Sequence, residues 1–223
     1  MISLTEENYL KAIYKISEKQ DSNKPVSTNA VSKEIKTSAA SVTDMLKRLS
    51  EKDLINYEKY KGVSLTKKGT KVATNLIRKH RLWEVFLVQQ LKFSWDEVHE
   101  VAEQLEHIKS ETLVRRLDDF LDNPKFDPHG DPIPDEDGNM TFRKQSQLSE
   151  MEEGQEGVVV GVTEDSTPFL QYLTKLGLEL GSKIKIMEKY EYDNSIKIKM
   201  NKKKEQILTE KISQNLLIKI KGE

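Results

Sequence analysis

Cysteine is missing from this 223-residue sequence, which excludes both disulfide bonds and thiolate metal sites. No apolar run reaches the roughly 18 residues that a membrane-spanning helix requires, so no membrane partner is expected. The first residues, Met1 to Glu7, lack the basic and apolar regions of a signal peptide, and we expect a cytoplasmic protein. Hydrophobic residues make up only 36% of the chain and charged residues 33%, a composition compatible with several small cores.

The net charge of -1 conceals an uneven distribution of charge along the chain. Residues 1–70 contain 13 Lys or Arg against 9 Asp or Glu, an excess of four positive charges. Residues 94–140 contain 4 against 14, an excess of ten negative charges. This asymmetry predicts that the N-terminal part binds a polyanion and that the middle part binds cations.

Apolar residues at helical spacing predict three short helices in the basic part, over 5–17, from Ser27 onward, and over 39–52. Thr5 is expected to cap the first of them. Two short strands, 54–58 and 63–65, then flank a basic tip. A helix-turn-helix followed by such a hairpin is a winged helix, and double-stranded DNA is its predicted partner. An ordinary helical surface and a winged helix used for protein contacts are the alternatives.

Small polar and basic side chains are predicted to contact the DNA, because they can approach base edges and neutralise phosphates. The predicted DNA-binding residues are Ser38, Ala39, Ala40, Ser41, Thr43, Asp44, Lys47 and Arg48 on the third helix and Lys59 and Lys61 in the wing.

Three longer helices are predicted next, over 66–90, 95–107 and 110–121. Three helices this rich in apolar residues would leave apolar surface exposed in a monomer, so we expect a homodimer. A dimer also carries two winged helices, which suits the two halves of a palindromic DNA site. From 149 onward, short alternating strands around one helix predict a small β-barrel. The predicted fold is mainly α with a small β domain, divided into a winged helix (1–70), a helical metal-binding and dimerisation domain (71–147) and a barrel (148–223).

Histidine and carboxylate side chains recur at helical spacing in the acidic part. On the predicted helix over 95–107, Glu103 lies three residues before Glu106 and four before His107, with His99 on the same border. His80 and Glu84 are four residues apart on the preceding helix. Imidazole and carboxylate ligands suit Mn²⁺, Fe²⁺ or Zn²⁺. The alternative is that these are solvated residues at the edge of a helix.

The domain order and four sequence blocks resemble the diphtheria toxin repressor and manganese transport regulator family, in particular its manganese-responsive branch. The matching blocks are Glu7 to Leu10, Lys79 to Glu84, Glu97 to His107 and Pro128 to Pro134. The resemblance implies a metal-dependent repressor with no small organic substrate. In that family a divalent metal acts as corepressor, here Mn(II) or alternatively Fe(II), and the loaded dimer binds palindromic operators of metal-uptake genes.

The resemblance also implies two metal sites, whose ligands we list by number in this sequence. The primary ligands are His80, Glu103, Glu106 and His107, with Asn8 or its neighbour Glu7 from the first helix. The second-site ligands are Glu84, Asp127, His129 and Asp165, with His99 as an alternative. Glu103 stands where iron-responsive members tend to carry cysteine, which favours manganese. Lys11 stands where manganese regulators have a further carboxylate, so a two-manganese cluster is not expected.

Without metal, the clustered carboxylates are expected to repel one another and to leave the first helix free. Metal would then tie that helix down and fix the spacing of the two heads. A metal-dependent hydrolase is one alternative, but no nucleophile or glycine-rich loop accompanies the ligands, and we do not predict an enzyme. A metal-independent winged-helix DNA-binding adaptor is the other alternative.

Overall fold

The computed structural model describes residues 2–20, 24–201 and 204–222. The chain forms two compact units. The first contains the chain up to His80 together with Glu103–Glu111 and Pro134–Met140, and the second contains Arg81–Ala102, Thr112–Ile133 and Thr141–Glu223. The predicted fold class, mainly α with a small β domain, is confirmed by eight α-helices and a six-stranded sheet among the described residues.

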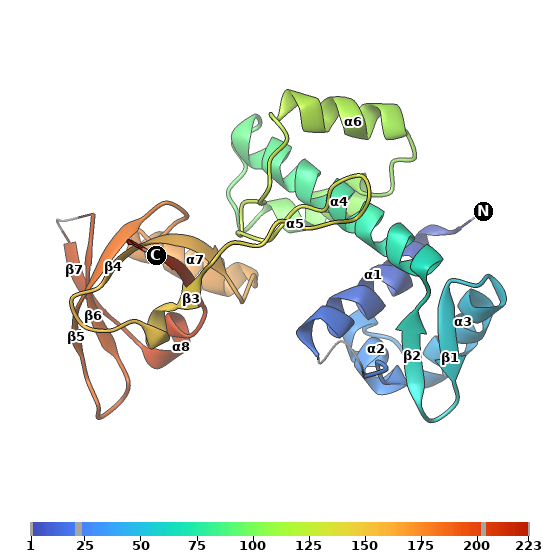
Figure 1. Ribbon diagram of the computed structural model, residues 1–223, viewed down its shortest axis with the longest axis horizontal. Helices are drawn as coiled ribbons and strands as arrows, with labels where there is room; N and C mark the ends of the chain where they lie inside the picture. The colour runs from blue at the N-terminus through green and yellow to red at the C-terminus, as the bar shows by residue number, and fades with distance from the viewer. Residues whose placement is uncertain (1, 21–23, 202–203, 223) are drawn as a thin grey trace. The chain divides into compact units, whose positions relative to one another are not determined.

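A winged helix makes up most of the first unit (Figure 1). It consists of α1 (Leu4–Lys19), α2 (Thr28–Ile35), α3 (Ala39–Glu51) and the antiparallel pair β1 (Ile55–Glu58) and β2 (Gly62–Leu65). These helices and strands match the predicted elements to within two residues, because apolar side chains at helical spacing form one shared core. The core residues include Leu10, Ile13, Val31, Val42, Leu46, Leu49 and Val63.

Serine side chains cap all three helices of the winged helix. Ser3, Ser27 and Ser38 each accept a hydrogen bond from the backbone N–H three residues later. The expectation that Thr5 caps the first helix is therefore wrong. Ser3 has the advantage because the Glu6 side chain accepts a hydrogen bond from its backbone N–H, which completes a capping box.

Glycine at position 62 allows the wing to pack against the loop before α2. Gly62 has a φ of 115°, and a Cβ there would lie 2.6 Å from the carbonyl oxygen of Val26. Val26 and Val63 exchange two backbone hydrogen bonds of 2.8 and 2.9 Å at this place. The close approach of these two backbone segments thus requires a residue without a side chain at position 62.

Helix α4 (Lys67–Gln89) is followed by α5 (Val98–Leu105) and α6 (Glu111–Phe120). The predicted helix over 95–107 is shorter than expected, since it starts at Val98 and ends at Leu105. Glu106 and His107 consequently lie in the turn that follows α5 rather than on its face.

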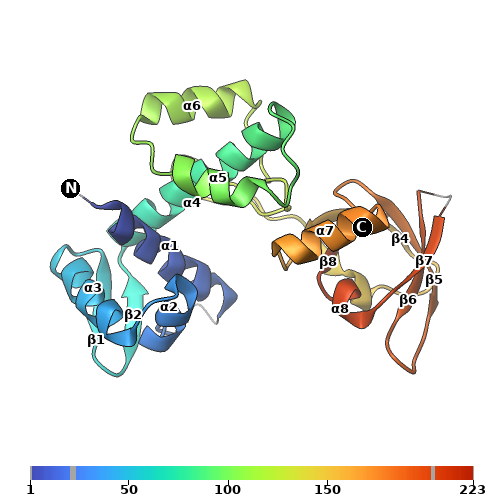
Figure 2. The same ribbon diagram turned by 180° about the vertical axis from the view of Figure 1, so that it is seen from behind.

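The second unit contains a six-stranded antiparallel sheet with strand order β3-β8-β4-β5-β6-β7, seen from both sides in Figures 1 and 2. Register shifts in β4 and β5 mark irregularities that bend the sheet around its core. Its elements are β3 (Ser146–Gln147), η1 (Leu148–Glu150), β4 (Glu156–Val162), α7 (Thr167–Leu176), β5 (Lys183–Lys189), β6 (Ile196–Met200), β7 (Lys204–Leu208), α8 (Glu210–Ser213) and β8 (Leu216–Ile220).

Strict alternation correctly predicted β6, whose residues Ile196, Ile198 and Met200 are buried. Strand β7 and helix α8 were not predicted, because Lys204–Leu208 is mostly polar and α8 is only four residues long. Along the described stretches of the chain, none of the helices combines the length and apolar character needed to cross a membrane.

Candidate metal centre and nucleic-acid interface

Helix α1 brings two charged side chains, one helical turn apart, to the turn after α5. Glu7 Oε2 lies 2.7 Å from His107 Nδ1. Lys11 Nζ lies 2.5 Å from Glu106 Oε2. The helix places them on one side because residues four apart share a face. All four residues belong to the first unit, which also contains the winged helix.

Glu106 is the centre of this first cluster, which we define as Glu7, Lys11, His80, Glu106 and His107. Its Oε2 atom also lies 2.5 Å from His80 Nδ1, and its Oε1 atom lies 3.8 Å from His107 Nε2. His80 Nδ1 is in turn 3.3 Å from Lys11 Nζ. A ring nitrogen that donates to Glu106 cannot also accept from Lys11, so Glu106 is the shared acceptor for both groups.

Burial and charge act in opposite directions on the central pair. Burial raises the pKa of the Glu106 carboxyl, but the hydrogen bond from His80 and the charge of Lys11 outweigh it, so the pKa is lowered overall. Burial lowers the pKa of Lys11 by more than the charge of Glu106 raises it. The expected repulsion between unpaired carboxylates is therefore wrong at Glu106, because its negative charge is paired with Lys11 inside the protein.

The predicted primary-site residues do not all gather at Glu106. His80 and His107 both contact Glu106, and Glu7 contacts His107. Asn8 is exposed, and so is Glu103, whose charge nevertheless stabilises the charged form of Lys11. The carboxylate and imidazole donors of the first cluster fit a borderline divalent cation. Which of these residues are ligands stays a prediction.

A second cluster lies in the second unit and consists of Glu84, Asp127 and His129. One donor atom from each residue lies within 4.8 Å of the others, and all three are buried. Asp127 Oδ1 accepts backbone hydrogen bonds from His129 and Asp131, at 2.8 and 3.0 Å, which orients the carboxylate. These oxygen and nitrogen donors also fit a divalent cation.

The loop that carries Asp127 and His129 is held tightly. Gly130 has a φ of 93°, and a Cβ there would lie 2.2 Å from the carbonyl oxygen of Val160. Arg143 donates to the carbonyl oxygens of Gly130 and Val160. Its guanidinium also lies over the ring of Phe126, 3.9 Å from the centroid. The residues around Gly130 thus keep Asp127 and His129 in a fixed relationship.

His129 presents only one ring nitrogen to the second cluster. Its Nε2–H donates to the backbone carbonyl of Trp95 at 2.6 Å, and the two rings stack with centroids 6.4 Å apart. Its Nδ1 faces Glu84 Oε2 at 3.8 Å. Such a hydrogen bond fixes the orientation of a histidine and leaves the other nitrogen available for a metal.

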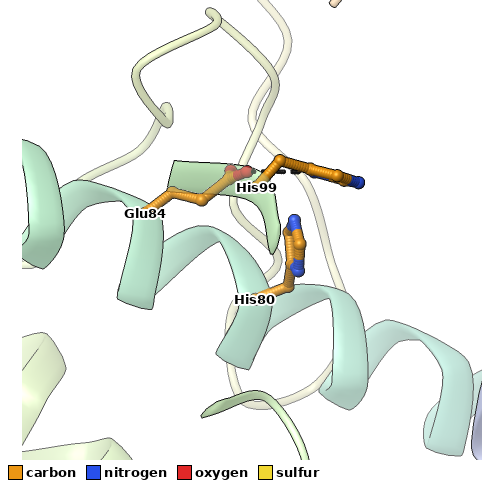
Figure 3. A group of neighbouring side chains, drawn as sticks. All are labelled: His80, Glu84 and His99. Carbon is orange, nitrogen blue, oxygen red and sulfur yellow. Dashed lines mark hydrogen bonds and ion pairs between the residues drawn. The ribbon is translucent and has the colours of Figure 1, made fainter. Parts of the chain in front are cut away.

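Glu84 also contacts the predicted alternative ligand His99, whose Nδ1 lies 3.4 Å from Glu84 Oε1 (Figure 3). His80 precedes Glu84 by one turn of α4 in the same view. Asp165 is exposed in the segment before α7 and is not part of the second cluster. Its role as a ligand stays a prediction.

The electrostatics of the second cluster favour protonation. Burial, together with the charges of Glu84 and Asp131, raises the pKa of Asp127 to about 7. Burial lowers the pKa of His129, but the hydrogen bond and charge of Glu84 outweigh it and raise that pKa to about 9. Arg81, which the sequence did not single out, opposes the shift of Asp127 from 3.6 Å away. A proton and a metal ion would thus compete for this cluster.

The predicted nucleic-acid interface combines the start of α3 with the wing. Lys47 and Arg48 are exposed, as are Lys59 and Lys61. A cavity of about 310 Å³ lies between the wing, the N-terminus of α2 and Thr43 of α3. The other predicted residues at the start of α3 are exposed as well, namely Ser38, Ala39, Ala40, Ser41 and Asp44.

Several of these interface side chains already have partners within the protein. Lys47 pairs with Asp44 at 3.6 Å, and Lys61 pairs with Glu58 at 2.6 Å. The Thr43 hydroxyl donates to the Ala39 carbonyl at 2.9 Å. Contacts with DNA would have to compete with these surface interactions, which are weak because water screens them.

Three family models match consecutive parts of the chain. Residues 1–63 match the N-terminal DNA binding domain of the iron dependent repressor, and residues 66–135 match its metal binding and dimerisation domain. Residues 146–220 match the FeoA domain. A regulator of the helix-turn-helix type from Methanocaldococcus jannaschii, MJ0568, is 34% identical over 119 residues, which are 53% of this chain and 94% of that protein.

The chain belongs to the iron-dependent repressor family. This confirms the resemblance to the diphtheria toxin repressor and the manganese transport regulator. The iron-dependent repressor IdeR of Mycobacterium tuberculosis is 35% identical over 130 residues, which are 58% of this chain and 55% of IdeR. The chain thus matches about half the length of the IdeR proteins.

A solved structure of a related protein matches nearly the whole of this chain. A manganese-dependent transcriptional repressor in complex with manganese is 32% identical and has a TM-score of 0.82. It covers 96% of this chain, and the chain covers 98% of that structure. The fold of the family, with a DNA-binding head, a helical part and a C-terminal sheet, is therefore present throughout the chain.

Proposed function

We propose that this protein is a metal-dependent transcriptional repressor. Loaded with Mn(II), or alternatively Fe(II), a homodimer binds palindromic operators of metal-uptake genes in the cytoplasm. His80, Glu106, His107 and Glu7 hold the primary ion, with Glu103 and Asn8 as further candidates. A bound cation would supply positive charge to the buried carboxylate of Glu106.

One observation carries this proposal: helix α1 is shared by the winged helix and the first cluster. Its residues Tyr9, Leu10 and Ile13 are buried in the core of the head. Its residues Glu7 and Lys11 contact His107 and Glu106. A change in the charge or spacing of the cluster would therefore act directly on a helix of the DNA-binding head.

Exposed apolar side chains on α6 support a homodimer. Phe120 is 64% exposed and Leu113 is 40% exposed. Trp83 Nε1 is buried without a hydrogen-bond partner among the described residues. We assign these α4 and α6 side chains to the subunit interface, where large apolar residues commonly lie. A two-fold dimer presents two heads to the two halves of a palindrome.

The donor set supports manganese over softer ions. The first and second clusters offer carboxylate oxygens and imidazole nitrogens, which suit Mn(II) and Fe(II). The similar structure bound to manganese points the same way, whereas the IdeR relatives point to iron. Because other divalent ions bind such sites tightly in the test tube, the metal must be ranked by its effect on DNA binding.

Fluorescence anisotropy tests the proposal. The full chain is titrated onto labelled DNA from upstream of its own gene and of metal-transport genes, with Mn(II), anaerobic Fe(II) or chelator at fixed salt. Binding that needs metal and is lost with chelator is the expected result. A Glu106→Gln variant should lose the response to metal. Equal binding in chelator and in metal would overturn the proposal and favour a metal-independent adaptor.

A further inference from the structure

Lys11 places its ammonium group beside both the carboxylate of Glu106 and the imidazole of His80. Its Nζ atom is 2.5 Å from Glu106 Oε2 and 3.3 Å from His80 Nδ1. A metal ion held jointly by that carboxylate and that imidazole would need the same space. The ammonium group and a metal ion therefore cannot both lie between Glu106 and His80.

Water screens the ion pair between Lys11 and Glu106 only weakly, because both side chains are buried. The side chains of Lys11 and Glu106 are 7% and 1% exposed. A buried carboxylate without a partner is costly, and Lys11 supplies the missing positive charge. The exposed pair of Lys47 and Asp44 on α3 has no comparable effect, since both side chains lie in solvent.

We propose that Lys11 is an internal cation that competes with divalent metal for Glu106 and so sets the metal concentration at which the first cluster fills. The inference rests on the proposed function, because it takes Glu106 and His80 as ligands. Lys11 holds α1 to Glu106 when metal is absent. Metal must displace the ammonium group to bind, and Glu7 then remains as the contact between α1 and His107.

Substitution of Lys11 provides the first test. Mn(II) affinity is measured without DNA, by competition with a fluorescent chelator, for the wild type, Lys11→Gln and Lys11→Arg. Removing one nearby positive charge should tighten binding by about tenfold to a hundredfold in Lys11→Gln. Lys11→Arg should keep the affinity of the wild type. The matched control is Lys19→Gln, which removes an equal charge from an exposed position of α1.

The outcomes separate this inference from the proposed function. A folded Lys11→Gln variant with unchanged or weaker Mn(II) affinity overturns the role of Lys11 alone. A wild type that binds neither Mn(II) nor anaerobic Fe(II) overturns the proposed function as well. Should Lys11→Gln fail to fold, acetylation of wild-type lysines decides the matter. Mn(II) should increase the labelling of Lys11 but not of exposed Lys19, and unchanged labelling of Lys11 would overturn the inference.

Discussion

Glu7 and His107 are 100 residues apart in the chain, yet the Oε2 atom of one lies 2.7 Å from the Nδ1 atom of the other. This contact distinguishes Glu7 from its neighbour Asn8, which is exposed. Glu7 is accordingly the better candidate for the ligand that α1 contributes, and the two residues can be compared directly.

Glu7→Gln should weaken Mn(II) binding by about tenfold or more, because it removes a charged donor from the first cluster. Asn8→Ala should leave the affinity unchanged, since its side chain points into solvent. Chelator competition on the two purified variants measures both effects. The reverse order of sensitivity would assign the ligand role to Asn8.

The stability of the metal-free protein should fall as pH rises from about 4 to about 9. Folding raises the pKa of Asp127 from 3.8 to about 7, so the folded protein binds this proton more tightly than the unfolded chain does. The resulting stabilisation is complete below pH 3.8 and is lost as pH rises through 7. The pKa of His129 is raised to about 9, so its contribution is complete below 6.5 and is lost through 9.

Thermal unfolding in chelator measures this pH dependence. A loss of at least about 1 kcal/mol should lower Tm by about 2–4 °C in a chain of this size. Asp127→Asn should flatten the slope below pH 7 and leave the slope above it, whereas His129→Gln should do the opposite. A Tm that is constant or rises over this range would contradict the prediction.

Arg48→Ala and Lys47→Ala should each weaken DNA binding and lower the salt dependence of the binding constant by about one unit of slope. Both side chains are exposed on α3, so their removal should not disturb the core. Lys219→Ala, at an exposed position of β8, is the control. Anisotropy at several salt concentrations gives the slopes. Equal slopes for the wild type and all three variants would mean that DNA binds elsewhere on the protein.

Phe120→Asp should raise the dimer dissociation constant by at least about 100-fold, because each of its two copies contributes about 1.5–3 kcal/mol when buried in the interface. Phe142→Asp replaces another exposed phenylalanine, 77% accessible, outside α6 and should leave the dimer intact. Analytical ultracentrifugation distinguishes the two. Dimers of equal strength in both variants would move the interface away from α6.

Local sequence patterns predicted most of the fold. Helical spacing gave α1, α3, α4 and α6, and alternation gave β6, because burial on one face leaves a period in the sequence. Strand β7 escaped because its residues are mainly polar and exposed at the edge of the sheet. The end of α5 at Leu105 was also missed, since Glu106 and His107 continue the helical period without belonging to the helix.

The first cluster could be predicted only in part. His80, Glu106 and His107 were identified by spacing and by resemblance, but the pairing of Lys11 with Glu106 joins positions 95 residues apart and leaves no local signal. The spacing of four residues between Glu7 and Lys11 was visible, yet it resembles any helical ion pair. The same limit applies to Arg81, whose contact with Asp127 depends on how the loop after α6 folds.

The second cluster offers few ligand atoms to a metal ion, because some of its oxygen and nitrogen atoms already have partners in the protein. Asp127 Oδ1 is committed to two backbone N–H groups and His129 Nε2 to the Trp95 carbonyl. The atoms of these two residues that are left for a metal ion are Asp127 Oδ2, 3.6 Å from Arg81 Nε, and His129 Nδ1, 3.8 Å from Glu84 Oε2. A divalent ion held by one atom from each of the three residues would leave part of its coordination shell to water. We expect such a shell to exchange its ion faster than a closed four-ligand shell does. We therefore expect a metal site at this cluster to follow the concentration of free metal rather than to store metal.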